Sequence, residues 1–407
     1  MEILILGAGL AGACAALALR RLGHAVTLVE RRSAPDRLGG GVVLWPNAGL
    51  VLARLGLLDE VRAGAGTPPW MVRMDASGAP LTRLDIGALD RAMGCASHAI
   101  LRRDLQAILL AHAQRLGVTL RGGVRALALR RAGAGRAQVH FDDGGVAGAD
   151  LIVGADGRMQ SVAGQYVHGA VAPLYQGFVN WVGSLEAAPD LLGDLLDDSL
   201  DPLAVRDYWG VGRRFGIVPV GRRKLYWAAA VAEAAPGAAG RADAKAELDE
   251  LFGAWPQPVG RILAHSRSAA IRRIPLYDLE PKPCWQRDNV LLIGDAAHAS
   301  LPTSGQGAGQ ALEDAWHLAQ CLPLTTRRRD LACALARFTR ARFEKTSAIT
   351  HAGRALAHAL FQLDGEGSRV RDAQARGADP RQMVAAMARG WGAGLDLAPP
   401  PGADAAQ

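Results

Sequence analysis

The chain opens with the stretch MEILILGAGLAGACAALALRRLGHAVTLVE, residues 1–30, and this stretch decides the fold. Ile3 to Leu6 is a short apolar run that predicts a strand, and Ala13 to Leu22 predicts a helix. His24 to Val29 alternates and predicts a second strand that ends at Glu30. A strand, a glycine-rich turn, a helix and a second strand within about 30 residues are the context in which a glycine fingerprint has meaning.

The turn between the first strand and the helix carries three glycines. Gly7 permits the tight turn, Gly9 lets the backbone approach a diphosphate, and Gly12 lets the helix pack closely on the strand. The diphosphate is expected at the helix N terminus, where free N–H groups and the dipole favour anions. Glu30 lies 18 residues (30 − 12) after Gly12, where a carboxylate accepts from the hydroxyls of an unphosphorylated ribose. The stretch predicts binding of a dinucleotide such as FAD or NAD.

Composition excludes several other classes of protein. The run from Ile3 to Leu19 is uncharged, but it is short, contains three glycines and lacks a basic flank, so neither a signal peptide nor a membrane span is expected. The five cysteines are scattered and show no metal-like spacing, which predicts no metal site and a reducing cytoplasm. The net charge of +7 comes from small arginine clusters, so we expect no nucleic-acid partner.

The 407 residues, half of them hydrophobic, suggest two domains. The predicted fold is α/β, with a Rossmann-like FAD-binding domain, an inserted antiparallel β-sheet substrate domain and C-terminal helices. The insertion is indicated by β-rich segments at residues 175–185, 205–211, 215–220 and 225–231. The predicted boundaries are 1–70, 98–166 and 280–355 for the FAD-binding domain, 71–97 and 167–279 for the sheet domain, 356–396 for a helical region and 397–407 for a disordered tail.

Two further motifs have the form of a strand running into a turn with an acid. One is DLIVGADG at residues 150–157, and the other is NVLLIGD at residues 289–295. The second is followed by a glycine-rich loop, residues 301–310, and by a helix expected from about Ala311. Such an arrangement delivers a carboxylate to polyol hydroxyls and exposes backbone N–H groups at a helix start. Taken singly, each motif is equally compatible with an ordinary strand-end turn.

Together these motifs resemble the FAD-dependent aromatic hydroxylases, the group A flavin monooxygenases with the p-hydroxybenzoate hydroxylase fold. The resemblance covers about residues 1–355, and its most specific run is GDAAHASLPTSGQGAGQALED at residues 294–314. It implies that Asp295 binds the flavin ribityl chain and that Pro302 lies beside the isoalloxazine. It also implies that the backbone of residues 305–309 contacts the pyrimidine edge of the flavin.

Other segments match the same family. GGGVVLWPNA at residues 39–48 resembles its flavin-facing loop, and RRDL at residues 102–105 resembles its Arg-x-x-Leu segment. Asp156 and Gly157 match the element associated with both FAD and NAD(P)H. The predicted cofactor-binding residues are Gly7, Gly9, Leu10, Ala11, Gly12, Glu30, Arg31, Gly41, Val42, Arg102, Asp156, Gly157, Gly294, Asp295, Gly305, Gly307, Ala308 and Gly309.

One element departs from the family pattern. In the family, two residues usually separate the Asp-Gly pair from a serine, and an arginine follows three residues after that serine. Here Ser161 comes one residue later, and Gly164 stands where the arginine is expected. This departure puts the detailed nicotinamide contacts in question, but not the binding of FAD.

The segments FVNWVG, residues 178–183, and RFGIVPV, residues 214–220, most resemble the urate and salicylate hydroxylase branch. In that branch an arginine and a tyrosine at the places of Arg214 and Tyr226 border the active site. The predicted catalytic residues are therefore Arg214, Tyr226 and Pro302. For Tyr226, a half-buried strand aromatic is an equally good interpretation.

The reaction that the resemblance implies consumes NADH or NADPH and O₂. Reduced FAD forms a 4a-hydroperoxide, which inserts one oxygen atom into an aromatic or heteroaromatic small molecule. Two alternatives stay open, namely a flavin-dependent oxidoreductase without oxygen insertion and a non-catalytic flavin-bound partner protein. A halogenase of the tryptophan type is disfavoured because its Trp-x-Trp-x-Ile-Pro element is absent. The sequence does not reveal the substrate, the choice of nicotinamide or the oligomeric state.

Two groups of residues allow either a packing role or a functional one. His298 lies in the most specific run, where it serves either the turn or acid-base chemistry, and His98 is a candidate pocket residue. Four tryptophans could line an aromatic cavity, but tryptophan is more commonly a core residue. They are Trp45, Trp181, Trp209 and Trp227.

Overall fold

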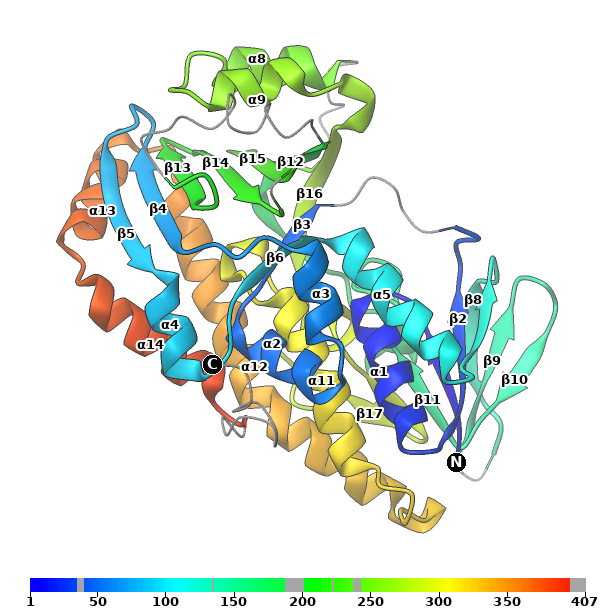
Figure 1. Cartoon of the computed structure of the whole chain (residues 1–407). Coiled ribbons are helices and arrows are strands. Elements are labelled where there is room, and N and C mark those ends of the chain that lie inside the picture. The colour runs from blue at the N-terminus through cyan, green and yellow to red at the C-terminus, as the bar shows by residue number, and fades with distance from the viewer. Residues whose placement is uncertain (35–39, 134, 187–200, 222, 237–242, 396–407) are drawn as a thin grey trace. The chain divides into compact units, whose positions relative to one another are not determined.

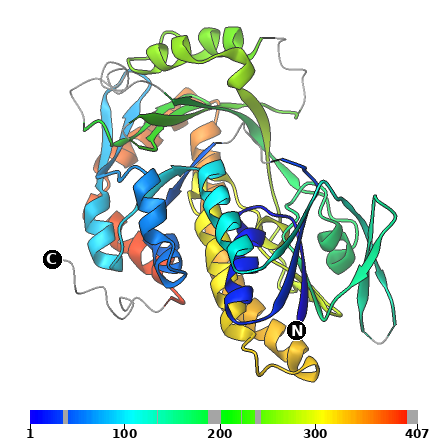
Figure 2. The same ribbon diagram turned by 45° about the vertical axis from the view of Figure 1, so that its right-hand side comes forward.

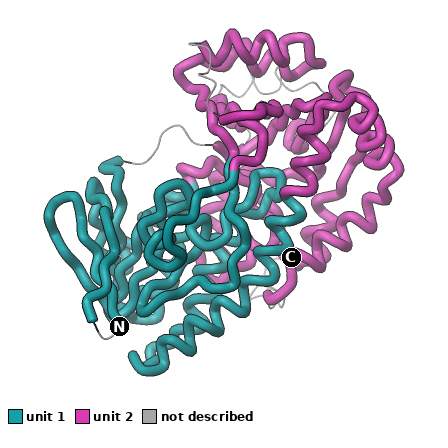
Figure 3. The backbone as a smooth tube through the Cα atoms, turned by 180° about the vertical axis from the view of Figure 1, so that it is seen from behind, with its two compact units in different colours: residues 1–36, 105–174, 277–353 teal, residues 37–104, 175–276, 354–407 magenta. Residues whose placement is uncertain are grey.

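The computed structural model describes residues 1–34, 40–133, 135–186, 201–221, 223–236 and 243–395 (Figure 1). The predicted tail at 397–407 and the first glycine of the segment 39–48 lie outside the described residues. By its internal contacts the chain divides into two compact units (Figure 3). Unit 1 comprises residues 1–36, 105–174 and 277–353, and unit 2 comprises residues 37–104, 175–276 and 354–407.

Unit 1 is built on a six-stranded sheet with the strand order β17-β18-β11-β1-β2-β7. All neighbouring pairs are parallel except β17 with β18. Its strands are β1 (Glu2–Leu6), β2 (Ala25–Glu30), β7 (Thr119–Gly122), β11 (Leu151–Gly154), β17 (Gln286–Arg287) and β18 (Val290–Leu292), and a separate sheet holds β8 (Ala126–Arg131), β9 (Ala137–Phe141) and β10 (Val146–Gly148).

Helices α1 and α11 of unit 1 pack against each other (Figure 2). The helices with residues in this unit are α1 (Leu10–Arg21), α5 (Arg102–Arg115), α6 (Val162–His168), α10 (Asp295–His298), α11 (Gly307–Cys321) and α12 (Leu331–Phe361), of which α5 begins and α12 ends in unit 2. Helix α11 begins at Gly307 rather than near Ala311 as expected. Because a helix N terminus tolerates glycine, the glycine-rich stretch forms its first turn instead of preceding it.

Unit 2 contains a seven-stranded sheet with the order β16-β12-β15-β14-β13-β4-β5. Its strands are β4 (Trp70–Asp75), β5 (Pro80–Asp85), β12 (Leu174–Glu186), β13 (Val205–Gly210), β14 (Arg213–Pro219), β15 (Lys224–Ala232) and β16 (Arg272–Asp278). Strand β12 is antiparallel to β15, and the pairs β13–β14, β14–β15 and β4–β5 are antiparallel as well, whereas β13 and β4 are parallel. The four predicted β-rich segments correspond to β12 through β15, so the predicted α/β fold with an inserted sheet is confirmed.

One face of this sheet carries the main core of unit 2. Alternate residues such as Phe215, Ile217 and Trp227 pack there against helices α8 (Ala244–Phe252) and α9 (Val259–His265). In Figures 1 and 2 both helices lie along the sheet. Trp181 and Trp227 are buried in this core, which settles the choice between cavity and packing for these two residues.

The opposite face of the sheet is polar and open in its middle. Register places four residues of neighbouring strands in one row on this face, namely Arg73, Asp207, Gly216 and Ala228. Residues paired across strands point to the same side, and so do residues two positions along a strand. The same face therefore also presents Trp209, Arg214, Val218 and Tyr226. We call it the polar face.

The rest of unit 2 surrounds a two-stranded sheet of β3 (Gly41–Leu44) and β6 (His98–Leu101). Its helices are α2 (Pro46–Arg54), α3 (Leu58–Gly64), α4 (Ile86–Met93), α13 (Gly365–Gly377) and α14 (Pro380–Gly392). Unit 2 also contains residues 37–70 and 98–104, which were expected in the FAD-binding domain. They belong to unit 2 because β3 pairs with β6 and because Gly41 packs against Tyr226. None of the described helices has the length and apolarity needed to cross a membrane.

Candidate functional site

The three motif-bearing strands of unit 1 are neighbours in the order β18-β11-β1. Because they are parallel, their carboxyl ends meet at one edge of the sheet, which is where open α/β sheets bind ligands. Glu30 ends the next strand, β2, at the same edge. Residues 7–12, 154–157 and 294–295 are brought together in this way.

The three glycines of the first turn have distinct surroundings. Gly7 has φ +100°, and a Cβ on it would lie 2.4 Å from the carbonyl oxygen of Ala155. A Cβ on Gly12 would lie 1.9 Å from the carbonyl oxygen of Gly7, so only glycine allows α1 to pack this closely on the turn. A Cβ on Gly9 would meet nothing within 4 Å. Gly9 therefore leaves the N terminus of α1, which has no side-chain cap, accessible to a ligand.

Glu30 organises the adjacent backbone. Its carboxylate accepts from the backbone N–H of Ala8 at 2.9 Å and from that of Arg32 at 3.0 Å. The carboxylate is thereby fixed beside the glycine turn with further lone pairs able to accept from ribose hydroxyls. Arg31 is exposed next to it.

Asp156 caps helix α6. Its two oxygens accept from Ser161 Oγ at 2.5 Å and from the backbone N–H groups of Val162 and Ala163 at 2.7 and 3.1 Å. Ser161 accepts in turn from the N–H of Gly164 at 2.7 Å. A Cβ at Gly164 would lie 2.9 Å from Ser161 Oγ, so the displaced serine and the glycine form one local structure. The departure from the family pattern thus rebuilds the start of α6.

An arginine does approach the flavin motif, but from a different position. Arg158 Nη1 donates to Asp295 Oδ2 at 2.9 Å, and Nε of Arg158 is buried without a hydrogen-bond partner among the described residues. Arg158 also lines a pocket together with His168 and Lys282. The sequence analysis missed Arg158, although it lies directly after the Asp-Gly pair.

The loop before α11 presents further free N–H groups. Gly305 adopts the left-handed conformation with φ +64°, and a Cβ on Gly307 would meet nothing within 4 Å. Helix α11 has no side-chain cap at its N terminus, where Ala308 and Gly309 continue the first turn. Pro302 lies in a short 3-10 turn, which Thr303 ties to α12 by donating to the carbonyl oxygen of Gly353 at 2.7 Å.

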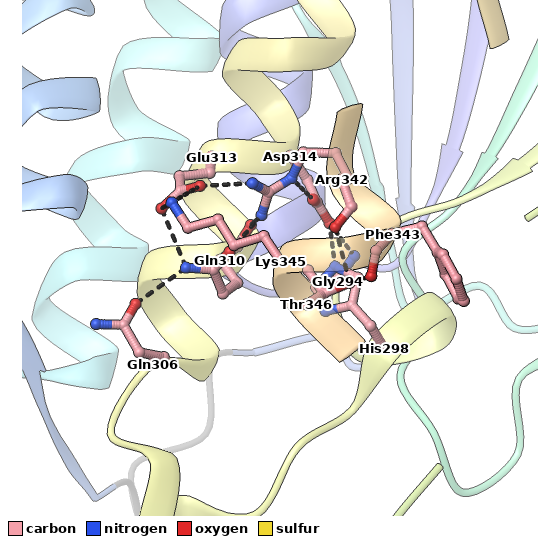
Figure 4. Close-up of polar contacts among 10 residues, drawn as sticks. All are labelled: Gly294, His298, Gln306, Gln310, Glu313, Asp314, Arg342, Phe343, Lys345 and Thr346. Carbon is pink, nitrogen blue, oxygen red and sulfur yellow. Dashed lines mark hydrogen bonds and ion pairs between the residues drawn. The ribbon is translucent and has the colours of Figure 1, made fainter. Parts of the chain in front are cut away.

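A buried network of charges holds this loop (Figure 4). Arg342 of α12 donates through Nε to Asp314 Oδ1 at 2.8 Å and through Nη1 to Glu313 Oε2 at 2.5 Å, with all three side chains fully buried. Lys345 Nζ adds a second cation, 2.9 Å from Glu313 Oε2. Two carboxylates and two cations thus balance inside unit 1.

Asp314 connects this network to the third motif. Its Oδ2 accepts from the backbone N–H of Gly294 at 2.7 Å and lies 2.6 Å from His298 Nε2. Burial acts to raise the pKa of Asp314, but His298 and Arg342 outweigh burial and hold that pKa well below its usual range. Asp314 therefore stays ionised and fixes the turn that carries Asp295. His298 serves the turn by this contact, which favours the first of its two interpretations.

In unit 2, Arg214 and Asp207 form a two-point ion pair on the polar face. Arg214 Nε lies 2.6 Å from Asp207 Oδ1, and Nη2 lies 3.1 Å from Oδ2. Trp209 Nε1 also donates to Asp207 Oδ2, at 2.9 Å. Burial acts to lower the pKa of Arg214, but the charge and hydrogen bonds of Asp207 outweigh it, so the pKa is raised. Arg214 is held as a cation of fixed orientation.

Tyr226 lies against the glycine loop. A Cβ on Gly41 would lie 2.8 Å from Tyr226 Cβ, and one on Gly40 would lie 3.0 Å from its ring. The backbone N–H of Arg102 donates to the Gly40 carbonyl at 3.0 Å, and Val42 pairs with Ile100, so the loop is well anchored. Burial raises the pKa of Tyr226 to about 12, although the charge of Arg214 opposes the rise.

The predicted site residues therefore fall into two groups. Unit 1 gathers the glycine turns, Glu30, Asp295 and Pro302, and unit 2 gathers Gly41, Val42, Arg102, Arg214 and Tyr226. Sequence reasoning missed Asp207 and Arg342. In the sequence, these two residues are marked only by a charged side chain at a position expected to be buried. Their partners lie far along the chain or on another strand, so no local pattern identifies the pairs.

A sequence model of the FAD binding domain matches residues 1–342. The chain belongs to the FAD-dependent aromatic hydroxylases. It is 32% identical to aurachin C monooxygenase/isomerase of Stigmatella aurantiaca, over 85% of this chain and 86% of that protein. It is also 32% identical to 3-amino-4-hydroxybenzoate 2-monooxygenase of Streptomyces cremeus, over 98% of this chain and 99% of that protein.

A solved structure agrees with this assignment. Klebsiella pneumoniae HpxO complexed with FAD and uric acid matches with a TM-score of 0.85 and 27% identity, over 96% of each chain. FAD is thus the cofactor of this flavoprotein. The residues present fit it, because Gly9 and Gly307 leave two uncapped helix N termini accessible, with the carboxylates Glu30 and Asp295 beside them.

The same substitution at two glycines is expected to have different effects. Gly12→Ala forces a Cβ against the Gly7 carbonyl and should cost the apoprotein about 2 kcal/mol, seen as a lower Tm. Gly9→Ala meets no protein atom, so the Tm of the apoprotein should be unchanged. Its Kd for FAD should rise about tenfold or more, because the methyl group occupies the surface that the diphosphate approaches. Equal losses of apoprotein Tm in both variants would contradict these roles.

Acid destabilisation is expected to depend on His317 of α11. Burial lowers the pKa of His317 to about 4, with help from Arg342, and its Nε2 has no partner among the described residues. Between about pH 6.5 and 4 the unfolded chain then binds more protons than the folded protein, so the free energy of unfolding falls as pH falls. His317→Gln should flatten the decrease of Tm across this window. His265→Gln, on an exposed histidine, is the control and should leave the slope unchanged.

Proposed function

We propose that this flavoprotein is an NAD(P)H-dependent monooxygenase that inserts one oxygen atom into an aromatic or heteroaromatic small molecule. The overall change is substrate–H + O₂ + NAD(P)H + H⁺ → substrate–OH + H₂O + NAD(P)⁺. The proposal is carried by the polar face of unit 2 in a chain that belongs to this family. On that face the cation Arg214 and the phenol Tyr226 flank the open position at Gly216.

Arg214 and Tyr226 suit a substrate that becomes electron-rich by losing a proton. The positive charge of Arg214 stabilises a phenolate-like oxygen and lowers the pKa of the substrate. Tyr226, with its pKa raised to about 12 by burial, stays protonated at neutral pH and donates its O–H rather than competing as an anion. When bound, FAD supplies the redox chemistry between the nicotinamide and O₂.

Pro302 and the glycines around it serve the flavin in this proposal. The 3-10 turn at Pro302 is tied to α12 by Thr303 and followed by the uncapped start of α11. N–H groups fixed in this way hold partial positive charge in place without rearranging during the reaction.

The reductant has a candidate site in unit 1. The pocket beside α6 is lined by Arg158 and Lys282, whose positive charges suit the phosphates of a nicotinamide nucleotide. Gly157 also lines it, and this residue belongs to the element that the family resemblance links to NAD(P)H. The pocket supports use of a nicotinamide without choosing NADH or NADPH. Cytoplasmic localisation is part of the same proposal and accords with five cysteines that form no disulfide.

The direct test is turnover by the FAD-loaded protein under air. We expect oxidation of NADH or NADPH that an aromatic ligand accelerates, and a product whose mass has gained one oxygen atom that derives from labelled O₂. Nicotinamide oxidation with a product that lacks added oxygen would instead establish the first alternative, an oxidoreductase without insertion. Bound FAD that neither nicotinamide reduces would establish the second, a non-catalytic partner.

Tyr226→Phe tests the substrate-facing hydroxyl. Loss of a hydrogen bond to a charged oxygen should lower kcat/KM by about ten- to a hundredfold and move the pH optimum upward, toward the substrate's own pKa. Tyr175→Phe is the matched control, since it removes a hydroxyl from β12 of the same sheet that donates to the Glu233 carbonyl at 2.9 Å. Equal activity of both variants, with full FAD content, would refute the role of Tyr226.

A further inference from the structure

The polar face carries a second arginine that the proposed reaction does not use. Arg73 of β4 pairs in register with Asp207 of β13, so its side chain lies on the same face as Arg214. Its guanidinium carbon is 5.3 Å from the ring centroid of Trp209, the residue that also donates to Asp207. Arg73, Asp207, Trp209 and Arg214 therefore form one cluster.

The charges of this cluster do not balance. Asp207 gives both oxygens to Arg214 and one of them also to Trp209. Nε of Arg73 is buried and has no hydrogen-bond partner among the described residues. The next carboxylate on this face, Asp75, is taken by Arg376 at 2.7 Å and by Ser77. Two guanidinium groups thus share one carboxylate, and one positive charge is left over.

Arg73 is partly exposed, but its buried Nε leaves a hydrogen bond unmade, which is costly. Burial lowers the pKa of Arg73 and so does the charge of Arg214, while Asp207 compensates in part. A desolvated charge is normally paired, and an unpaired buried guanidinium is destabilising unless a ligand completes it. The Trp209 ring and Asp207 offset part of this cost, and an anionic ligand would satisfy the remaining charge.

Open space lies in the same row of the sheet. A Cβ on Gly216 would meet only the carbonyl oxygen of Ala228, at 3.9 Å. Gly216 and Ala228 are adjacent across β14 and β15, and both are partly exposed. Neighbouring strands are about 4.8 Å apart, so the surface formed by these two small residues is about as wide as an aromatic ring. Only β13, with Asp207, separates it from Arg73.

We propose that the substrate of this enzyme is an aromatic acid, whose carboxylate binds Arg73 while its ring lies on Gly216 and Ala228, with Arg214 left to the phenolate-like oxygen. The inference rests on the proposed function and adds the substrate class and a specificity-determining residue, Arg73. A carboxylate offers the two acceptors that one guanidinium group can engage through parallel hydrogen bonds.

Equilibrium binding tests the inference without turnover. The oxidised, FAD-loaded protein is titrated by calorimetry with matched pairs of acid and amide: 3-amino-4-hydroxybenzoate, 4-hydroxybenzoate and salicylate, each against its amide. We expect at least one acid to bind about tenfold more tightly than its amide, the ratio of a charge-assisted hydrogen bond. Arg73→Met should bring that ratio to within about threefold, and Arg73→Lys should give an intermediate ratio.

Arg83→Met is the matched control. Arg83 lies on β5 of the same sheet but on the opposite face, is exposed and stacks 3.9 Å from the Trp70 ring centroid. It should leave the ratio of acid to amide affinity unchanged. If Arg73→Met lowers the FAD content or the Tm, the ratio of acid to amide affinity is compared between the wild type and the variants Arg73→Gln and Arg73→Lys instead.

Two outcomes would overturn the inference. One is a wild-type protein that binds none of the acids more tightly than its amide, and the other is an unchanged preference in folded Arg73 variants. Neither depends on oxygenation, because no reductant is present in the titration. Failure of the monooxygenase proposal would appear separately, as the absence of an oxygenated product in the turnover assay.

Discussion

Close packing of backbone at the carboxyl ends of β1, β11 and β18 is the constraint on which the flavin site depends. A Cβ on Gly12 would lie 1.9 Å from the Gly7 carbonyl oxygen, and one on Gly154 would lie 2.2 Å from Ala163 Cβ. A Cβ on Gly294 would likewise lie only 2.7 Å from Ala11 Cβ. Three strand ends and the first turn of α1 can meet only because these residues lack side chains. Gly9, where a Cβ would meet nothing within 4 Å, leaves the uncapped N terminus of α1 accessible to a diphosphate.

The buried charges around Arg342 address a second requirement, which is orientation. A buried ion pair gives little net stability, because desolvation offsets the attraction, but breaking it is costly. The network therefore holds α11, α12 and the Gly294 turn in one arrangement more than it adds to the free energy of unfolding. Asp295 lies at the end of that turn, so its position is fixed as well. An ion pair with Arg158 orients its carboxylate further.

Sequence reasoning located the motifs that lie within single strand-turn-helix units. The glycine turn with Glu30 is one such unit and the run at 294–314 is another, and the parallel pairing of β1, β11 and β18 brings them to one sheet edge. It failed where partners come from different strands. Arg73 and Asp207 are separated by 134 positions (207 − 73) and meet only because β4 and β13 pair in parallel. No local pattern announces that pairing. The contact of Gly41 with Tyr226 likewise joins distant segments.

The sheet of unit 2 shows how strand periodicity divides labour between its two faces. Positions facing α8 and α9 are filled by large apolar side chains, which leaves little freedom to change them without creating cavities. The polar face has no such constraint in its middle, where Gly216 and Ala228 are small and the surrounding groups are charged or hydroxylic. Under the proposed function, substitutions there would alter what can be bound while the core behind them stays intact. Stability would then reside on one face of a strand and recognition on the other, so that one cofactor site could serve different aromatic substrates.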